Sequence, residues 1–169
     1  DLFDRAGGLF THYLVDAQDK NPPSNNSVAC ILEDRLATLW VGTSNGLQVF
    51  NRLDKTFKRY RSGIADVNPE TDYEVTSIYQ DRSGAIWVGT EDGLNRYDGY
   101  NFKVYKPDSD NPNSLSDRWI TSLAEDAQGY LWVGTRLGGL NRYDPQTGKF
   151  THFLYNPADT DGIGNNQIS

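Results

Sequence analysis

The tetrapeptide Trp-Val-Gly-Thr occurs three times in this chain of 169 residues, at positions 40–43, 87–90 and 132–135. The motif therefore recurs after 47 and then 45 residues, and each copy is followed a few residues later by Gly-Leu. Self-similarity at a period of about 20–50 residues is the signature of propellers, solenoids and other repeat arrays. This one tetrapeptide therefore decides the class of fold.

Other residues keep the register of the motif. An apolar residue opens each unit, 14 residues before the motif's glycine, and a phenylalanine near the end of each unit lies 18 residues before the next opening residue. The phenylalanines are Phe10, Phe57, Phe102 and Phe150, and the opening residues are Val28, Val75, Ile120 and Ile168. Length varies only between the motif's glycine and the next phenylalanine. Insertions therefore lie in the later turns of each unit.

Each unit contains four short runs of β-branched and aromatic residues, bounded by Gly, Asp and Asn, which is the pattern of strands and tight turns. The expected strands are 28–32, 39–43, 47–51 and 57–61, then 75–79, 86–90, 94–97 and 102–105, then 120–124, 131–135, 140–143 and 150–154. No apolar pattern of helical period is long enough to predict a helix. Four strands per unit are typical of one blade of a β-propeller, and a repetitive β-sandwich is the alternative.

The sequence thus predicts an all-β fold, a partial β-propeller of about three and a half four-stranded blades. We expect one partial propeller over 1–169, with blades at 27–61, 74–106 and 119–155. Residues 1–15 match the end of a preceding blade, and 166–169 match the start of a following one. The polar stretch 16–27 is expected to be a loop. Because the chain has no methionine and opens in mid-unit, we expect it to be a piece of a longer protein.

Charge and composition exclude several classes of function. The net charge is −7, the pI is about 4.7, and there is no run of Lys or Arg, so nucleic acid is not an expected partner. No stretch approaches the ~20 apolar residues of a membrane span, and no signal peptide is present. The single cysteine, Cys30, cannot form an intrachain disulfide and is expected to be a small buried thiol in a strand.

The repeated motif itself has a structural interpretation. The second strand of a propeller blade is buried against the neighbouring blades, so the tryptophan packs between sheets and the glycine permits close backbone approach. A binding site needs residues that differ between blades. The regularity of the motif therefore favours packing over chemistry.

The third unit carries the fullest copy of a longer pattern. It reads Glu-Asp-Ala-Gln-Gly-Tyr-Leu-Trp-Val-Gly-Thr over 125–135, Gly-Leu-Asn-Arg-Tyr-Asp over 139–144 and Gly-Lys-Phe over 148–150, after Asn-Pro-Asn-Ser-Leu-Ser at 111–116. These motifs resemble the two-component regulator propeller repeat, and the resemblance covers essentially the whole chain. The first unit departs most, because Leu36 and Ala37 stand where an Asp-Arg-x-Gly turn is expected and Leu-Gln-Val-Phe at 47–50 replaces Leu-Asn-Arg-Tyr.

The resemblance implies a function. Such repeats typically form the periplasmic sensor region of membrane-anchored two-component-type proteins, whose outputs are histidine kinase, hybrid kinase or diguanylate cyclase domains. Some members respond to oligosaccharides. The expected partners are therefore an oligosaccharide or other small ligand and the rest of the parent sensor. No enzymatic activity, cofactor or membrane contact is expected of this chain itself.

Candidate ligand-binding residues are found where the units differ. In propellers, the loop that enters each first strand lies on the same face as the turn between the second and third strands, and ligands usually bind there. The two residues before the first strand are small and polar at 26–27 and amides at 166–167, whereas Tyr73, Arg118 and Trp119 stand out, as does Arg136 in the later turn. An aromatic face with a guanidinium suits stacking on a sugar or binding a carboxylate. Packing between blades is the structural alternative for these side chains.

Other polar residues favour structural roles. His12 and His152 share one position of an outer strand and lack further ligands at metal spacing. Two oxygen-rich loops match no complete calcium motif and are ordinary turn chemistry, so no metal site is predicted. They contain Asp108, Asp110, Asn111 and Asn113, and Asp159 and Asp161. No nucleophile–base pair or phosphate loop is present, so no catalytic residue is predicted.

Two further functions and one mode of assembly remain as alternatives. The chain could be a protein-interaction scaffold without a small-molecule site, or a propeller-fold lyase with catalytic residues in the channel. Closed propellers have about four to eight blades, so three blades leave two open edges. We therefore expect self-association through blade edges, in which residues 1–15 of one chain and 166–169 of another share a blade.

Overall fold

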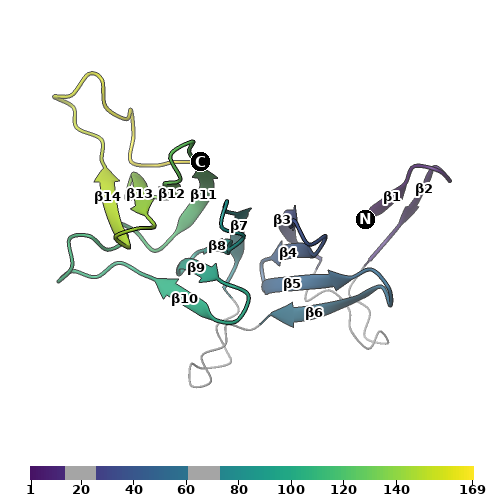
Figure 1. Ribbon diagram of the computed structural model, residues 1–169. Coiled ribbons are helices and arrows are strands. Elements are labelled where there is room, and N and C mark those ends of the chain that lie inside the picture. Colours follow the sequence, from purple (N-terminus) through teal and green to yellow (C-terminus); the bar gives the residue numbers. More distant parts are fainter. Residues whose placement is uncertain (14–25, 61–72) are drawn as a thin grey trace.

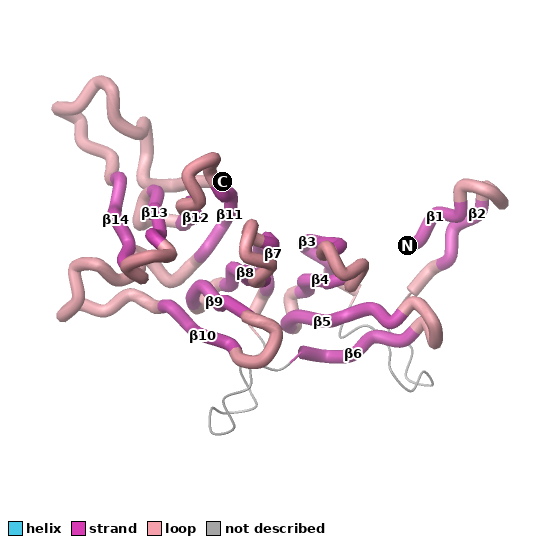
Figure 2. Tube along the Cα trace, viewed as in Figure 1, coloured by secondary structure: helices cyan, strands magenta, loops and turns pink. Residues whose placement is uncertain are grey.

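The computed structural model describes residues 1–13, 26–60 and 73–169. Within these ranges there is no helix, so none is present that could cross a membrane. Three four-stranded antiparallel sheets follow one another along an arc, and a two-stranded hairpin lies at its N-terminal end (Figures 1 and 2). This arrangement confirms the predicted all-β fold and partial propeller. Most of the predicted loop at 16–27 lies outside the described residues, as does Arg61, the expected end of one strand.

Each sheet is a meander whose strands pair in chain order. The hairpin contains β1 (Leu2–Asp4) and β2 (Leu9–Thr11), and the first blade contains β3 (Val28–Glu33), β4 (Leu39–Thr43), β5 (Gly46–Asn51) and β6 (Thr56–Tyr60). The second contains β7 (Val75–Gln80), β8 (Ile86–Thr90), β9 (Gly93–Tyr97) and β10 (Phe102–Tyr105). The third contains β11 (Ile120–Glu125), β12 (Leu131–Thr135), β13 (Leu140–Asp144) and β14 (Lys149–Phe153). Strands β3, β7 and β11 lie along the inner side of the arc (Figure 1).

An aspartate holds the motif's tryptophan in every blade. The indole Nε1 donates a 2.8 Å hydrogen bond to the aspartate at the first turn, six residues earlier. The pairs are Trp40 with Asp34, Trp87 with Asp81 and Trp132 with Asp126. The other carboxylate oxygen accepts a backbone N–H of the turn, for example that of Tyr130 at 3.0 Å. The acidic turn before the motif is therefore explained by the need to satisfy a buried indole N–H.

The motif's glycine receives the next blade. A Cβ on Gly42 would lie 2.6 Å from the Val75 side chain, one on Gly89 would lie 2.6 Å from Ile120, and one on Gly134 would lie 2.7 Å from Ile168. Each of these side chains belongs to the residue that opens the following unit. Val75 is 2% exposed and Ile120 is completely buried. We call this contact the glycine socket. A larger residue than glycine would clash there with the next blade and also with the side chain of the paired strand in its own blade.

The core lies largely between blades. The Trp40 ring contacts Tyr97 of the second blade at a centroid distance of 5.8 Å, and Trp87 contacts Tyr143 of the third at 5.2 Å. The hydroxyl of the same tyrosine lies 3.1 Å from that of Tyr60 in the first interface, and Tyr105 and Tyr143 repeat this at 3.0 Å in the second. Trp40 and Trp87 therefore join neighbouring sheets, as the packing interpretation of the sequence requires. Trp132 contacts Phe153 of its own blade at 5.2 Å.

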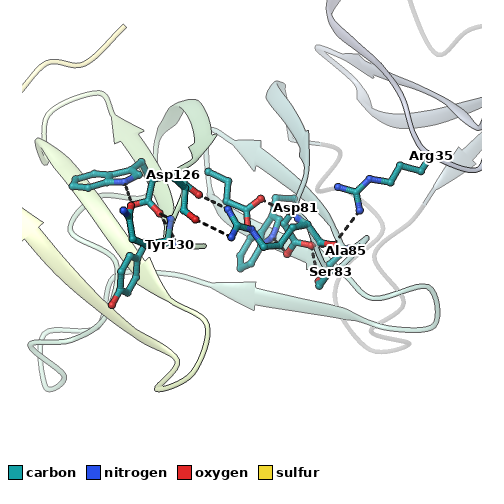
Figure 3. A network of polar contacts seen from close by, with 12 residues as sticks. Arg35, Asp81, Ser83, Ala85, Asp126 and Tyr130 are labelled. Atoms are coloured by element: carbon teal, nitrogen blue, oxygen red, sulfur yellow. Dashed lines mark hydrogen bonds and ion pairs between the residues drawn. The ribbon is translucent and has the colours of Figure 1, made fainter.

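Arginines link the first turns of adjacent blades (Figure 3). Arg35 donates from Nη1 to the carbonyl of Arg82 at 3.1 Å. Arg82 in turn donates to the carbonyl of Ala127 at 3.1 Å and forms an ion pair with Glu125 at 2.8 Å. The third blade has Ala127 at the arginine position, so the series of arginine contacts ends there.

The departure in the first unit has a conformational consequence. Ala37 has a φ of 61°, whereas the same turn position is filled by glycine in the other blades, with φ of 93° at both Gly84 and Gly129. A Cβ in the left-handed region costs about 1–2 kcal/mol. The first blade thus keeps the turn geometry of the repeat with a strained residue.

Replacing Ala37 with glycine is therefore expected to stabilise the protein. The free energy gained by relieving the strain exceeds the free-energy cost of the greater conformational entropy of the unfolded chain. Ala37→Gly should therefore raise the free energy of unfolding, measured by urea denaturation, by about 0.5–1 kcal/mol. Ala158→Gly is the control, because Ala158 is exposed and is not among the described residues with positive φ. The control should be neutral or slightly destabilising. A loss of stability in Ala37→Gly would contradict the strain argument.

Candidate functional site

In each blade, one backbone hydrogen bond joins the loop that enters the inner strand to the turn between the second and third strands. Ser44 N–H donates to the Ser27 carbonyl at 3.2 Å, Glu91 N–H to Glu74 at 3.3 Å, and Arg136 N–H to Trp119 at 2.9 Å. The entering loop and the turn are the two segments whose residues depart from the repeat, and the fold therefore brings them together. Arg136 and Trp119 are thus neighbours in space.

In the third blade these two side chains stack. The Arg136 guanidinium lies 4.2 Å from the centroid of the Trp119 ring, a cation–π contact that restrains the long arginine side chain. Arg136 is exposed and Trp119 is half-buried. Two other arginines also lie over tryptophans, Arg96 over Trp87 and Arg142 over Trp132. Those two arginines occupy one repeated position and serve blade packing, whereas Arg136 replaces Ser44 and Glu91 of the other turns.

Asp117, which the sequence pattern did not single out, fixes this turn. Its carboxylate accepts the backbone N–H of Trp119 at 3.3 Å and that of Leu137 at 2.9 Å. A Cβ on Gly138 would lie 2.6 Å from the Cβ of Asp117, so the turn packs tightly on the loop. The sequence carries one sign of this difference, since the turn of the third blade is one residue longer. The hydroxyl of the motif's threonine donates to the carbonyl four residues ahead in this blade and three residues ahead in the other two.

Tyr73, the candidate from the second blade, belongs to a separate cluster. Lys106 forms an ion pair with the Asp92 carboxylate, and its Nζ lies 5.6 Å from the Tyr73 ring centroid. The hydrogen bond between Tyr73 and Asp92 is the main cause that raises the pKa of Tyr73, followed by burial. For Asp92, burial acts to raise the pKa, but the hydrogen bonds from Lys106 and Tyr73 and the charges of Lys106 and Arg118 lower it overall. Tyr73 is thus engaged with internal partners, and Arg118 lies close enough to act on this cluster.

Arg118 and Arg136 differ from Asp92, Lys106 and Asp117 on this face, which are held by an ion pair or by hydrogen bonds. Within the described ranges, neither guanidinium forms an ion pair or a side-chain hydrogen bond. Both side chains are exposed. The two arginines therefore have donors that remain open to an acceptor from outside.

The remaining candidates have structural partners. His152 Nε2 lies 2.7 Å from the Ser114 carbonyl and holds the entering loop, whereas His12 Nδ1 lies 2.8 Å from Asp1. Side-chain oxygens of the two oxygen-rich loops accept backbone N–H groups two residues ahead, as Asp108 does from Asp110 at 3.0 Å. No group of three or more His, Cys, Asp or Glu in the described part of the chain is placed to hold a metal ion.

Cys30 is half-buried, whereas the sequence predicted a fully buried thiol. Burial raises the pKa of the thiol to about 11, against the smaller, opposite effect of a backbone hydrogen bond involving Gly42. The thiol thus stays protonated at neutral pH. The cysteine has no feature of a reactive group.

Comparison with known proteins identifies the repeats. The family model described as "Two component regulator propeller" matches residues 69–92 and 114–136, which confirms the resemblance expected from the motifs. A search of the curated proteins finds no match.

Solved structures extend the comparison. The chain is similar to the extracellular domains of two hybrid two-component systems from B. thetaiotaomicron. One is 32% identical with a TM-score of 0.72 over 85% of this chain, and the other is 25% identical with a TM-score of 0.73 over 91%. The chain spans 20% of the length of each of them. Virginiamycin B lyase from Staphylococcus aureus, 19% identical with a TM-score of 0.56 over 78% of this chain and 42% of its own, shares the fold alone.

The Asp92 cluster yields a titration prediction. Because its folded-state pKa is lowered, Asp92 contributes stability above its unfolded pKa, and this contribution is lost as the pH falls through the lower, folded pKa. In Lys106→Met, the titration midpoint of Asp92 followed by carboxyl NMR should move up towards the ordinary value. Lys103→Met removes the same charge from β10, where Lys103 lies over Tyr105, and should leave the midpoint unchanged. Equal midpoints in the natural protein and Lys106→Met would contradict the assignment.

Proposed function

We propose that this chain, which is built from two-component regulator propeller repeats, is part of an extracytoplasmic sensor and binds a small molecule such as an oligosaccharide. The proposal rests on the restrained, exposed Arg136 on Trp119, which occurs in one blade only and lies on the face where the entering loops meet the turns. The sensing role is supported by the similar structures, which are extracellular domains of hybrid two-component systems.

In this proposal the residues bind and do not catalyse. Arg118 and Arg136 supply hydrogen-bond donors and positive charge, Trp119 supports Arg136 from behind, and Asp117 holds the turn that carries it. Tyr73 contributes through the neighbouring Asp92 cluster, at the entrance of the second blade. The repeated residues of the blades supply a rigid frame, so a ligand at this face meets groups that are already placed.

The same comparison supports a location outside the cytoplasm. We place the chain outside the cytoplasm, in the periplasm, as part of a membrane-anchored protein whose other domains carry the signal onward. A ligand that bridges the entering loop and the turn of one blade would change the contacts between neighbouring blades. This change in the contacts between blades would transmit ligand binding to the rest of the sensor.

A scaffold that binds protein partners is the second candidate. A scaffold would bind its partner without a small molecule and would be indifferent to substitution of Arg136.

The experiment that tests the sensor proposal is a glycan array of neutral and acidic oligosaccharides, probed with the natural full-length protein. We expect saturable binding of a defined set of glycans, weakened at least tenfold by Arg136→Gln and by Trp119→Ala. Arg5→Gln is the matched control, because Arg5 is an exposed arginine in the turn of the β1–β2 hairpin. Unaltered thermal denaturation would show that each variant is folded. Absence of glycan binding by the natural protein, or equal binding by Arg136→Gln, would reject the proposal.

A further inference from the structure

Two exposed arginines lie on adjoining segments of an acidic chain. The net charge is −7, yet Arg118 and Arg136 lie on adjoining segments, because Arg136 N–H donates to the carbonyl of Trp119 at 2.9 Å. In the part of the chain that the structure describes, neither has an ion-pair partner. An exposed guanidinium without a carboxylate partner keeps its N–H donors for an anion from outside.

Two of the acidic groups on this face, Asp117 and Asp92, are already engaged. Both oxygens of Asp117 accept backbone N–H groups, from Trp119 and from Leu137, and so fix the turn. Asp92 is held by Lys106 and interacts with Tyr73. Arg118 acts on Asp92 only as a nearby charge, without an ion pair of its own. Neither of these carboxylates forms an ion pair with Arg118 or Arg136.

The stacking of Arg136 determines what it offers to a ligand. With its guanidinium 4.2 Å from the ring centroid, it covers one face of Trp119, so a sugar cannot stack on that face directly. A guanidinium that lies over a ring leaves its N–H donors at its rim free for an acceptor. A planar carboxylate accepts two such donors in parallel, with a geometry that no hydroxyl reproduces.

The surroundings favour a sugar over a bare ion. Leu137, next to Arg136, is 71% exposed, and Trp119 is half-buried. Apolar surface beside a charged fork suits a ligand that has C–H faces as well as an anionic group. The corresponding turn positions in the other blades are Ser44 and Glu91, so this combination exists in the third blade alone.

We propose that Arg118 and Arg136 bind the carboxylate of a sugar acid, a saccharide that carries a carboxyl group, with Leu137 against its ring and Trp119 behind Arg136. This inference rests on the proposed sensor function and names the class of ligand for the same site. Arg136 forms the bidentate contact, and Arg118 adds a second charge from the entering loop.

Saturation-transfer difference NMR tests the inference, since it reports the weak binding of small ligands to a large protein. The natural full-length protein is titrated with galacturonate, with neutral galactose and with galacturonate in the presence of sulfate. We expect galacturonate to bind at least tenfold more tightly than galactose. Arg136→Gln and Arg118→Gln should each weaken galacturonate at least tenfold, and Arg136→Lys should weaken it as well, because lysine keeps the charge and loses the fork. Arg5→Gln should bind as the natural protein does.

Several outcomes overturn the inference. Equal affinity for galacturonate and galactose would show that the protein does not recognise the carboxylate. The sensor proposal would stand, because the site would still bind a sugar. Displacement of galacturonate by an equal concentration of sulfate would show a simple anion site without sugar recognition. Absence of galacturonate binding would reject the sugar-acid ligand, and the glycan array then decides separately on the sensor proposal.

Discussion

The structure depends on one constraint, the glycine socket between neighbouring blades. Each glycine of the motif leaves room for the first apolar side chain of the following unit. A Cβ added to Gly42, Gly89 or Gly134 would lie only 2.6–2.7 Å from that side chain. This contact sets the spacing of the sheets, and the tryptophan before the glycine then reaches the tyrosine of the next blade. The spacing of 14 residues between the opening residue and the glycine is constant because both ends of that stretch belong to a socket.

The same constraint explains how much of the fold could be predicted. Contacts that recur in every blade leave recurring residues, so the strands, the buried tryptophans and the family followed from the repeated motifs. Ala37 could be seen as a departure, but only the backbone shows that it adopts the left-handed conformation of the glycines that it replaces. The half-buried state of Cys30 also escaped prediction, since it depends on which side of β3 is covered.

The candidate site was predicted in part. Departures from the repeat identified Tyr73, Arg118, Trp119 and Arg136, and the fold shows why two of them meet, because the entering loop and the turn share a hydrogen bond in every blade. Asp117 and Lys106 could not be assigned from the sequence, because their roles depend on side chains from other segments. The opposite ends of the inner strands carry the arginine links of Arg35 and Arg82, which repeat. One end of the blades thus holds the sheets together, and the other end carries the residues that occur once.

The central claim is that the glycine socket determines how blades join, and Gly89→Ala tests it most directly. The added methyl group would meet the Ser77 hydroxyl and the Ile120 side chain, so urea denaturation should show a loss of about 1–3 kcal/mol. Gly164→Ala is the matched control, because a Cβ there would meet no atom within 4 Å and the residue has no positive φ. The account predicts a large loss for the first substitution and little change for the second. Equal stability of the two variants would contradict it.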